Sequence, residues 1–258
     1  MSVVCPKTIT EHDRRIGGLG RAVGRVSLSW SQCAERGQAL TAIVLDRAAT
    51  VVLGLIAGVG SAIAASGGSL MIDLSQQQVG QPPRNFEFWR AGEADPRHWK
   101  VVREASSDGG MSIQQSGADR AAQPSLAIYT PVSAVNGKVR VRFKLIDGSM
   151  PSAGIAIRVT SPDDYYLVRA SAYEQRLALL HIVHGAAKEI AGVDADIAQD
   201  HWQTLEVVTR GNGFTMWLDD QWALTAFDYG KLVDGRFGIW TERDDVTRFD
   251  QIEIAPLT

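Results

Sequence analysis

The chain has 258 residues, of which 45% are hydrophobic and 21% are charged, and its formal net charge at pH 7 is −3. These values are ordinary for a folded globular protein of one or two domains. Residues 1–64 carry seven Lys/Arg against four Asp/Glu, whereas residues 65–258 carry 19 against 25. Because nucleic-acid binding needs a basic surface, the acidic second segment excludes nucleic acid as an expected partner.

An uncharged apolar run, AATVVLGLIAGVGSAIAAS, occupies residues 48–66 and contains Ala62-Ile63-Ala64 near its end. Small residues in this A-x-A pattern are typical of a signal-peptide cleavage site. We therefore expect residues 1–64 to be a helical or disordered export segment that is cut after Ala64. The mature protein would then be exported, to the periplasm or the extracellular space. A retained anchor is the alternative, since this run is near the minimum length for crossing a bilayer, and it would be the chain's only membrane contact.

The stretch before the apolar run is much longer than a usual charged n-region, which a misassigned start codon would explain. We expect residues 1–40 to be disordered or absent from the mature protein. Both cysteines, Cys5 and Cys33, lie in this segment. A mature domain without them would have no disulfide and no cysteine metal site, so a hydrophobic core must stabilise it.

Strand-like runs begin near residue 86, and the clearest one covers residues 138–145. Its apolar residues are Val139, Val141, Phe143 and Leu145, and they alternate with Lys138, Arg140, Arg142 and Lys144. A period of two with one apolar and one charged face is typical of a half-buried antiparallel strand. We therefore expect Val141 and Phe143 to be buried.

Turn signals separate this strand from many others. Asn136-Gly137 precedes it and Asp147-Gly148 follows it, and both dipeptides favour tight turns. The other expected strands cover residues 98–102, 111–115, 125–132, 155–159, 165–172, 177–183, 202–208, 214–218, 222–227, 237–241 and 249–254. No window has a sustained helical period, so the sequence predicts an all-β sandwich or barrel for residues 65–258.

Six motifs in order carry a resemblance to a known family: VRVRF at 139–143, SPDDYYLVRA at 161–170, WQTL at 202–205, GNGFTMWLD at 211–219, GRFGIW at 235–240 and FDQIEI at 249–254. Together they resemble the concanavalin A-like lectin/glucanase superfamily, and they are most similar to its secreted bacterial 3-keto-disaccharide hydrolase-like (LamG-like) family. The resemblance implies a two-sheet antiparallel jelly-roll β-sandwich and a carbohydrate or glycoside ligand. Hydrolase-like members often have Gly-Leu-Gln and a nearby His in the penultimate strand, where this chain reads GIWTE at 238–242. Hydrolase activity is therefore not implied with the fold.

A candidate sugar site lies on the polar phase of three successive strands, where Arg142, Arg158 and Arg169 would share one face if the strands pair in order. Tyr165 could lie on the same surface. Trp240 is out of phase with its apolar neighbours, which predicts an exposed ring. Arginines bind hydroxyls and carboxylates, and an aromatic ring stacks on the apolar face of a sugar. The alternative is a solvated face with cross-strand ion pairs. By the same alternation, Trp202 and Trp217 fit core positions.

A group of acidic residues follows Trp240 in the sequence. Glu242 is our candidate catalytic residue, because paired carboxylates serve glycoside hydrolysis, with Asp244 and Asp245 nearby. The alternative is a solvated loop. We expect no cofactor, although Asp73 and Asp250 could hold a structural Ca²⁺ where the first and last strands meet.

The sequence thus leaves three functions open. The preferred one is a carbohydrate-binding module with a glycan-directed concave face. The alternatives are a glycoside or 3-keto-disaccharide-type hydrolase and a structural interaction protein of the cell envelope.

Overall fold

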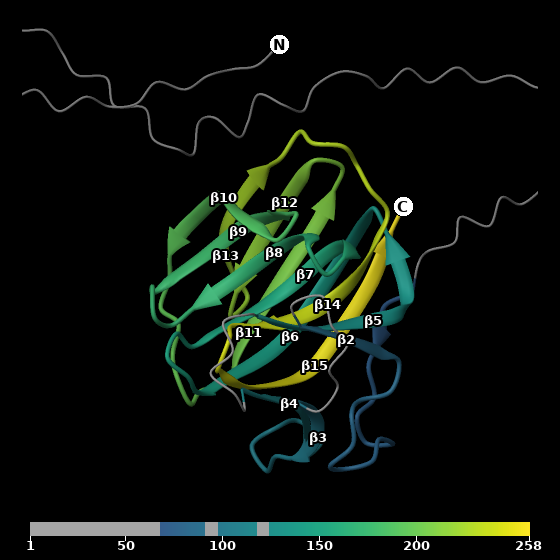
Figure 1. Cartoon of the computed structure of the whole chain (residues 1–258), viewed down its shortest axis with the longest axis vertical. Helices are drawn as coiled ribbons and strands as arrows, with labels where there is room; N and C mark the ends of the chain where they lie inside the picture. Colours follow the sequence, from purple (N-terminus) through teal and green to yellow (C-terminus); the bar gives the residue numbers. More distant parts are fainter. Residues whose placement is uncertain (1–67, 91–97, 118–123) are drawn as a thin grey trace, which may run out of the picture. The chain divides into compact units, whose positions relative to one another are not determined.

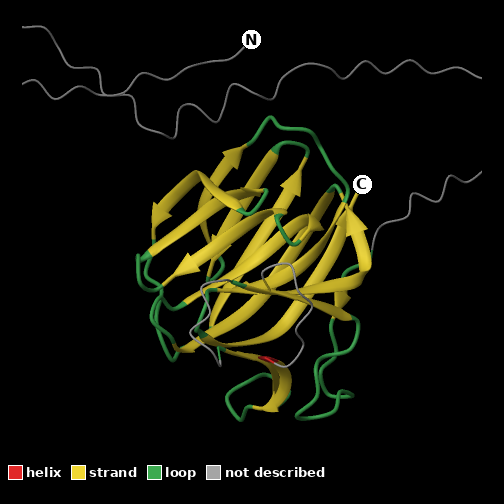
Figure 2. Cartoon of the chain, viewed as in Figure 1, coloured by secondary structure: helices red, strands yellow, loops and turns green. Residues whose placement is uncertain are grey.

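The computed structural model describes residues 68–90, 98–117 and 124–258 (Figure 1). The expected export segment, residues 1–64, lies outside the described residues. Within the described ranges, no helix is long and apolar enough to cross a membrane. The regular structure there is built of strands (Figure 2).

The strands form two antiparallel sheets, here named sheet A and sheet B, that pack face to face. Sheet A has the order β13 (Gln221–Phe227), β12 (Gly213–Leu218), β11 (Gln203–Arg210), β6 (Asn136–Asp147), β15 (Val246–Leu257), β4 (Met111–Ser116) and β3 (Trp99–Arg103), and β1 (Leu70–Met71) also pairs with β15. Sheet B has the order β10 (Ala186–Asp194), β9 (Arg176–Val183), β8 (Asp164–Ser171), β7 (Ser152–Ser161), β14 (Gly235–Thr241), β5 (Ser125–Ala134) and β2 (Phe86–Arg90). The predicted all-β, two-sheet jelly-roll sandwich is confirmed.

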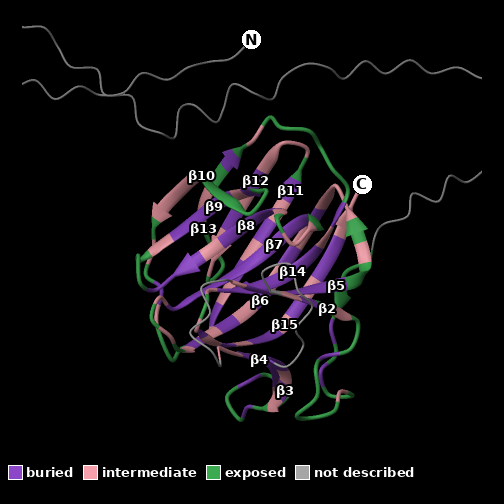
Figure 3. Cartoon of the chain, viewed as in Figure 1, coloured by how far each residue is buried: buried purple, intermediate pink, exposed green. Residues whose placement is uncertain are grey.

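The main core lies between the sheets and uses one phase of each strand. In β6, Val141 and Phe143 are almost completely buried, as predicted, while the alternate basic residues face outward. Phe214 from β12 and Phe237 from β14 are also fully buried and contribute to the same cluster. Large rings from both sheets therefore contribute to this core. Figure 3 shows that buried residues run along the central strands of both sheets.

Sheet B is unusual because its outer face is apolar as well. A second buried cluster on that face consists of Leu126, Ile128, Ala156, Val159, Tyr165, Leu167, Ala178, Leu180, Ile182 and Trp240. As a result, β7, β8 and β9 are buried over most of their length and do not alternate between buried and exposed residues.

The β12–β13 hairpin is closed by Asp219 and Asp220, which both have positive φ, at 48° and 63°. A two-residue turn with both φ values positive matches the right-handed twist of the flanking strands. Asp219 fixes this turn to β11, because its Oδ1 accepts a hydrogen bond of 2.7 Å from the backbone N–H of Thr204. The turn therefore sets the position of the edge hairpin of sheet A.

Truncating a core ring of β6 should destabilise the fold far more than truncating its outward neighbour. We expect Phe143→Ala to cost about 3–5 kcal/mol, because it leaves a cavity between the sheets. Arg140→Ala should cost less than about 1 kcal/mol, as exposed ion pairs contribute little. Denaturant melts of both variants would measure this, and a reversed order would contradict the register of β6.

Candidate functional site

The three predicted arginines do not share a face. Arg142 lies on the outer face of sheet A, because β6 belongs to that sheet, whereas β7 and β8 belong to sheet B. Arg169 follows the phase of Tyr165 and Leu167 and faces outward from sheet B. The prediction of one shared face is therefore wrong, because strands that follow each other in the sequence lie in different sheets.

Arg158 faces the space between the sheets and not the outer face, because a bulge interrupts β7 at this point. Its φ is 52°, and its side chain is 3% exposed. The guanidinium lies over the ring of Phe214, with 5.1 Å between the guanidinium carbon and the ring centroid. Its Nε donates a hydrogen bond of 2.8 Å to the carbonyl of Val135. Burial lowers the pKa of Arg158. Through its contacts with Phe214 and Val135, the residue links the two sheets at one end of the sandwich.

The other predicted residues do come together on the outer face of sheet B. Trp240 is opposite Gly154, and Gly154 is opposite Arg169 in the next strand. A Cβ atom at Gly154 would lie only 2.6 Å from Leu167 and 3.4 Å from the indole of Trp240. A side chain at position 154 would therefore clash with Leu167, so this row needs a glycine.

This face offers no open platform at its predicted ring. Trp240 is 3% exposed and Tyr165 is 4% exposed. Burial raises the pKa of Tyr165 to about 12, with a smaller contribution from the charge of Glu242. Arg169 is paired with Glu174. The predicted phase of Trp240 is right, since it packs with the outer cluster, but the prediction that it is exposed is wrong.

The three carboxylates beyond β14 have separate structural roles. Asp245 is fully buried, and its Oδ2 accepts a hydrogen bond of 2.8 Å from the backbone N–H of Ser152. Asp244 accepts a hydrogen bond of 2.8 Å from the hydroxyl of Ser149, which lowers its pKa. Glu242 lies 3.4 Å from Nε of Arg243. The loop therefore holds one enclosed carboxyl group and two that are already engaged.

The charged outer face of sheet A is compensated by acidic residues. Each outward Lys or Arg of β6 has a carboxylate within 3.2 Å: Lys138 and Arg140 with Glu206, Arg140 also with Asp220, Arg142 with Asp250, and Lys144 with Asp200. Arg142 also lies over the ring of Trp202, at 4.9 Å from its centroid. An ion-paired face, our alternative for the arginines, is what β6 presents.

Sequence reasoning missed a group of aromatic residues on the outer face of the β12–β13 hairpin. We name Trp217, Trp222, Phe227 and Tyr229 the aromatic strip. Trp217 is opposite the outward Glu206 on one side and opposite Trp222 on the other, so it faces outward and the predicted core position is wrong. Trp202 is also only partly buried, because it covers Arg142 and donates a hydrogen bond to Ser106.

The outer residues of the aromatic strip are open. Trp222 is 64% exposed, Phe227 is 57% exposed and Tyr229 is 81% exposed. The rings of Phe227 and Tyr229 are stacked, with their centroids 6.2 Å apart and their planes 11° apart. The sequence contains a signal for this surface. In residues 214–227 large apolar side chains occur on both faces of the strands, although an edge hairpin buries only one face.

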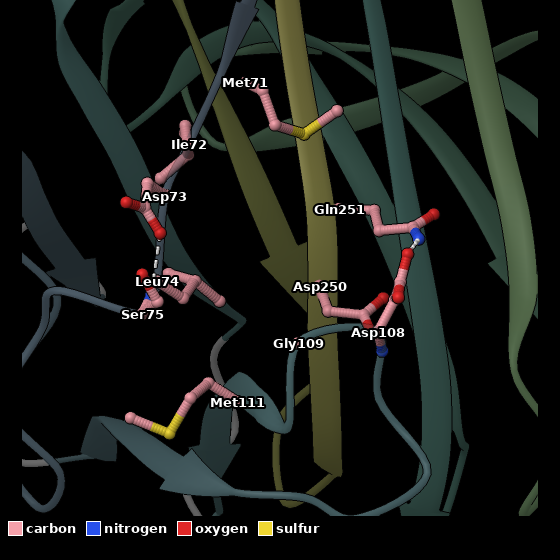
Figure 4. Close-up of a pocket in the computed structure, with 10 residues that line it drawn as sticks. All are labelled: Met71, Ile72, Asp73, Leu74, Ser75, Asp108, Gly109, Met111, Asp250 and Gln251. Carbon is pink, nitrogen blue, oxygen red and sulfur yellow. Dashed lines mark hydrogen bonds between the residues drawn. The ribbon is translucent and has the colours of Figure 1, made fainter.

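The structure also tests the suggested calcium site. Asp73 and Asp250 line one pocket beside β1 and β15 (Figure 4). Among the described residues, however, no group of three or more His, Cys, Asp or Glu is arranged to hold a metal ion. The Ca²⁺ site at Asp73 and Asp250 therefore stays a prediction.

The burial of Asp245 should make the stability of the domain depend on pH. Burial, with smaller contributions from the charges of Glu242 and Asp244, raises the pKa of Asp245 to about 8. A carboxyl group whose pKa is higher in the folded state favours folding most below its unfolded pKa of about 4. That contribution is lost as pH rises through 8.

We expect Asp245→Asn, which keeps an acceptor for Ser152, to match the native chain near pH 4 and to exceed it in stability by several kcal/mol near pH 9. Urea melts at both values would measure this. Asp194→Asn is the control, because its side chain is 97% exposed on β10, and it should leave the change between pH 6 and 9 as it is. Equal pH dependence in the native chain and Asp245→Asn would contradict the assignment.

No protein-family model matches the chain, and no curated protein matches its sequence. Solved structures with a similar arrangement include a CBM66 carbohydrate-binding module from Bacillus subtilis, which is 20% identical with a TM-score of 0.49 over 60% of this chain and 94% of that one. A β-glucanase from Bacillus licheniformis is 10% identical with a TM-score of 0.49 over 75% of this chain and 100% of that one. A putative glycosyl hydrolase from Parabacteroides distasonis is 12% identical with a TM-score of 0.46 over 69% and 91%. A function for this chain must therefore be argued from its own residues.

Proposed function

We propose that the β-sandwich is a carbohydrate-binding module that holds a glycan on the aromatic strip. The observation that carries the proposal is the exposure of three rings, Trp222, Phe227 and Tyr229, along one edge hairpin. Contiguous exposed apolar surface is rare on soluble proteins and marks binding sites. Stacking on the apolar face of a sugar would use these rings without ordering many side chains.

Polar groups lie beside the rings and suit sugar hydroxyls. The hydroxyls of Thr215 and Thr225 are hydrogen-bonded to each other at 3.1 Å, between Trp222 and Phe227. Nε1 of Trp222 donates to the same Thr225 at 3.3 Å. Hydroxyls both donate and accept, so this pair can exchange its internal hydrogen bonds for bonds to a sugar.

The strip favours an extended glycan over a single sugar. Trp222 and Phe227 are separated by five residues of strand, which corresponds to roughly 16 Å at a rise of about 3.3 Å per residue. Tyr229 extends the line of rings beyond the end of β13. A chain of several sugar units would contact all of these rings at once.

The hydrolase alternative, with Glu242 as the catalytic group, has weaker support. It requires two carboxyl groups facing a scissile bond. Asp245 is enclosed, and Asp244 is held by Ser149. We therefore propose binding without turnover. We also propose that the sandwich belongs to the 3-keto-disaccharide hydrolase-like family by descent. The apolar run at residues 48–66 supports action outside the cytoplasm.

Removing single rings of the strip should weaken glycan binding without changing the fold. We expect Trp222→Ala, Phe227→Ala and Tyr229→Ala each to weaken binding by about 1–3 kcal/mol, or roughly fivefold to 150-fold. Their melting temperatures should stay close to that of the native chain, because the rings are exposed. A glycan array would identify the ligand, and calorimetry with that ligand would measure the losses.

Tyr173→Ala is the matched control, because Tyr173 is 65% exposed on the β8–β9 turn, away from the strip. It should bind like the native chain. The proposal fails if all three strip variants bind normally, or if the control loses as much affinity as they do. Glu242→Gln should bind the glycan like the native chain. If the native chain hydrolysed the glycan and Glu242→Gln did not, the hydrolase alternative would be restored.

A further inference from the structure

The segment that joins sheet A to sheet B at the end of the aromatic strip is held by one side chain. Residues 228–234 run from β13 to β14 (Figure 1), and Asp228 is the one residue among them that is partly buried, whereas the other six are exposed. Asp228 also makes the only side-chain hydrogen bond and ion pair of this segment with described residues. It lies directly between Phe227 and Tyr229, the stacked pair of the strip.

The carboxyl group of Asp228 contacts two rings of sheet B. Its Oδ2 accepts a hydrogen bond of 2.8 Å from the hydroxyl of Tyr166 and lies 3.2 Å from Nδ1 of His181. Tyr166 in β8 and His181 in β9 are opposite each other, and their rings stack with centroids 4.1 Å apart and planes 11° apart. One carboxylate oxygen therefore ties the segment to two neighbouring strands.

The first of these two partners is fixed by the core. Tyr166 is 4% exposed, and its ring packs on Phe214 of sheet A with 4.9 Å between the centroids. Burial, together with the hydrogen bond to Asp228, raises the pKa of Tyr166 to about 12. The hydroxyl therefore keeps its proton throughout the neutral range and donates it to Asp228.

The second partner of Asp228 can change its charge. Histidine is the side chain that normally titrates between pH 5 and 8. A protonated His181 carries hydrogens on both ring nitrogens and forms a charge-assisted pair with the carboxylate, whereas a neutral imidazole has one hydrogen for two nitrogens. The attachment of the segment is therefore strongest at low pH and weakens as pH rises through this range.

The other charges around His181 stay constant over this range. Charged side chains from the neighbouring elements lie near it or near its ring partner: Asp228 and Lys231 in the segment, Asp164 in β8, Lys188 in β10 and Arg158 in β7. Carboxylates, lysines and arginines normally titrate outside pH 5–8. A change in attachment between these pH values is therefore assigned to His181.

We propose that Asp228 is a positioning residue of the aromatic strip and that the stacked Tyr166 and His181 are its anchor. The inference rests on the proposed glycan site and adds how that site is prepared. Tyr229 is 81% exposed, so without the anchor the glycan would have to order its ring on binding, which costs affinity. With the anchor, Phe227 and Tyr229 are stacked in advance, and glycan affinity falls as pH rises through the histidine range.

Nuclear magnetic resonance of the full chain without a ligand tests the anchor directly. The backbone order parameters of residues 229–234 should be about 0.85, a rigid value, at pH 5.5 and should fall at pH 8.5. Asp228→Ala removes both contacts and should give flexible values, below about 0.6, at both pH values. His181→Gln keeps the bond from Tyr166, so it should give intermediate values that do not change with pH.

His184→Gln is the matched control, because the side chain of His184 is 90% exposed just after β9 and lies near Asp164 instead of Asp228. It should keep the native change with pH. The proposal is overturned by native order parameters that are equal at both pH values, by a loss of the change in His184→Gln, or by a rigid segment in a folded Asp228→Ala. If Asp228→Ala does not fold, His181→Gln decides.

A glycan array probed with the native chain, His181→Gln and His184→Gln connects the anchor to binding. The native and His184→Gln signals should be at least about threefold higher at pH 5.5 than at pH 8.5, and the His181→Gln signal should be equal at both. Native binding that is independent of pH would overturn the positioning role. Absence of binding by every chain would instead contradict the glycan site itself, and the order parameters would still decide whether the anchor exists.

Discussion

The pairing of β6 with β15 is the interaction on which the rest of sheet A depends. These are the two longest strands of the sheet at 12 residues each, and they pair along most of their length despite two register shifts. On one side β6 carries β11 and through it the β12–β13 hairpin, and on the other side β15 carries β4 and β1. The β6–β15 pairing thus places the aromatic strip at one edge of sheet A. The pocket that Asp73 and Asp250 line is on the far side of β15 from β6.

The second constraint is the two-sided burial of sheet B. A sheet that buries apolar side chains on both faces cannot also present those side chains to a ligand. Trp240, Tyr165 and Leu167 pack together on the outer face, so the residues that look most like a sugar platform contribute to stability there. Trp222 and Phe227 are exposed instead on the β12–β13 hairpin of sheet A, where the edge strand has an uncovered face.

The sequence predicts the fold well because strand periodicity and turn chemistry are local. The alternation in residues 138–145 is found where expected, and Gly148 has a positive φ just after β6. The expected turn at Asn136-Gly137 is wrong, because both residues belong to β6 and pair with neighbouring strands. The candidate site could not be predicted in the same way, because it depends on which sheet each strand joins. Arg142 and Arg169 have the expected polar phase, yet they lie on different sheets.

Two further errors have different physical causes. The bulge at Arg158 reverses the direction of a side chain, and a positive φ at an arginine leaves no signal in the sequence pattern. For Trp240 the phase is predicted correctly, but phase does not tell whether an outer face is covered. Trp217 shows the opposite error, because a large apolar residue in an edge hairpin was assigned to the core although its opposite neighbour, Glu206, faces outward.

The aromatic strip and the pocket beside β1 and β15 should behave independently, and geometry gives the reason. Four interstrand steps separate β13 from β15, which corresponds to roughly 19 Å at about 4.8 Å per step. The ion-paired row of β6 lies between them, and its charges are neutralised by Glu206, Asp220, Asp250 and Asp200. Sites this far apart without shared partners couple weakly, so a change at the strip should leave the pocket as it is. Arg142 is the exception to watch, since it contacts both Trp202 in the row and Asp250 in the pocket. Any coupling between the two surfaces would have to pass through this side chain, because it joins the charged row to the buried carboxylate.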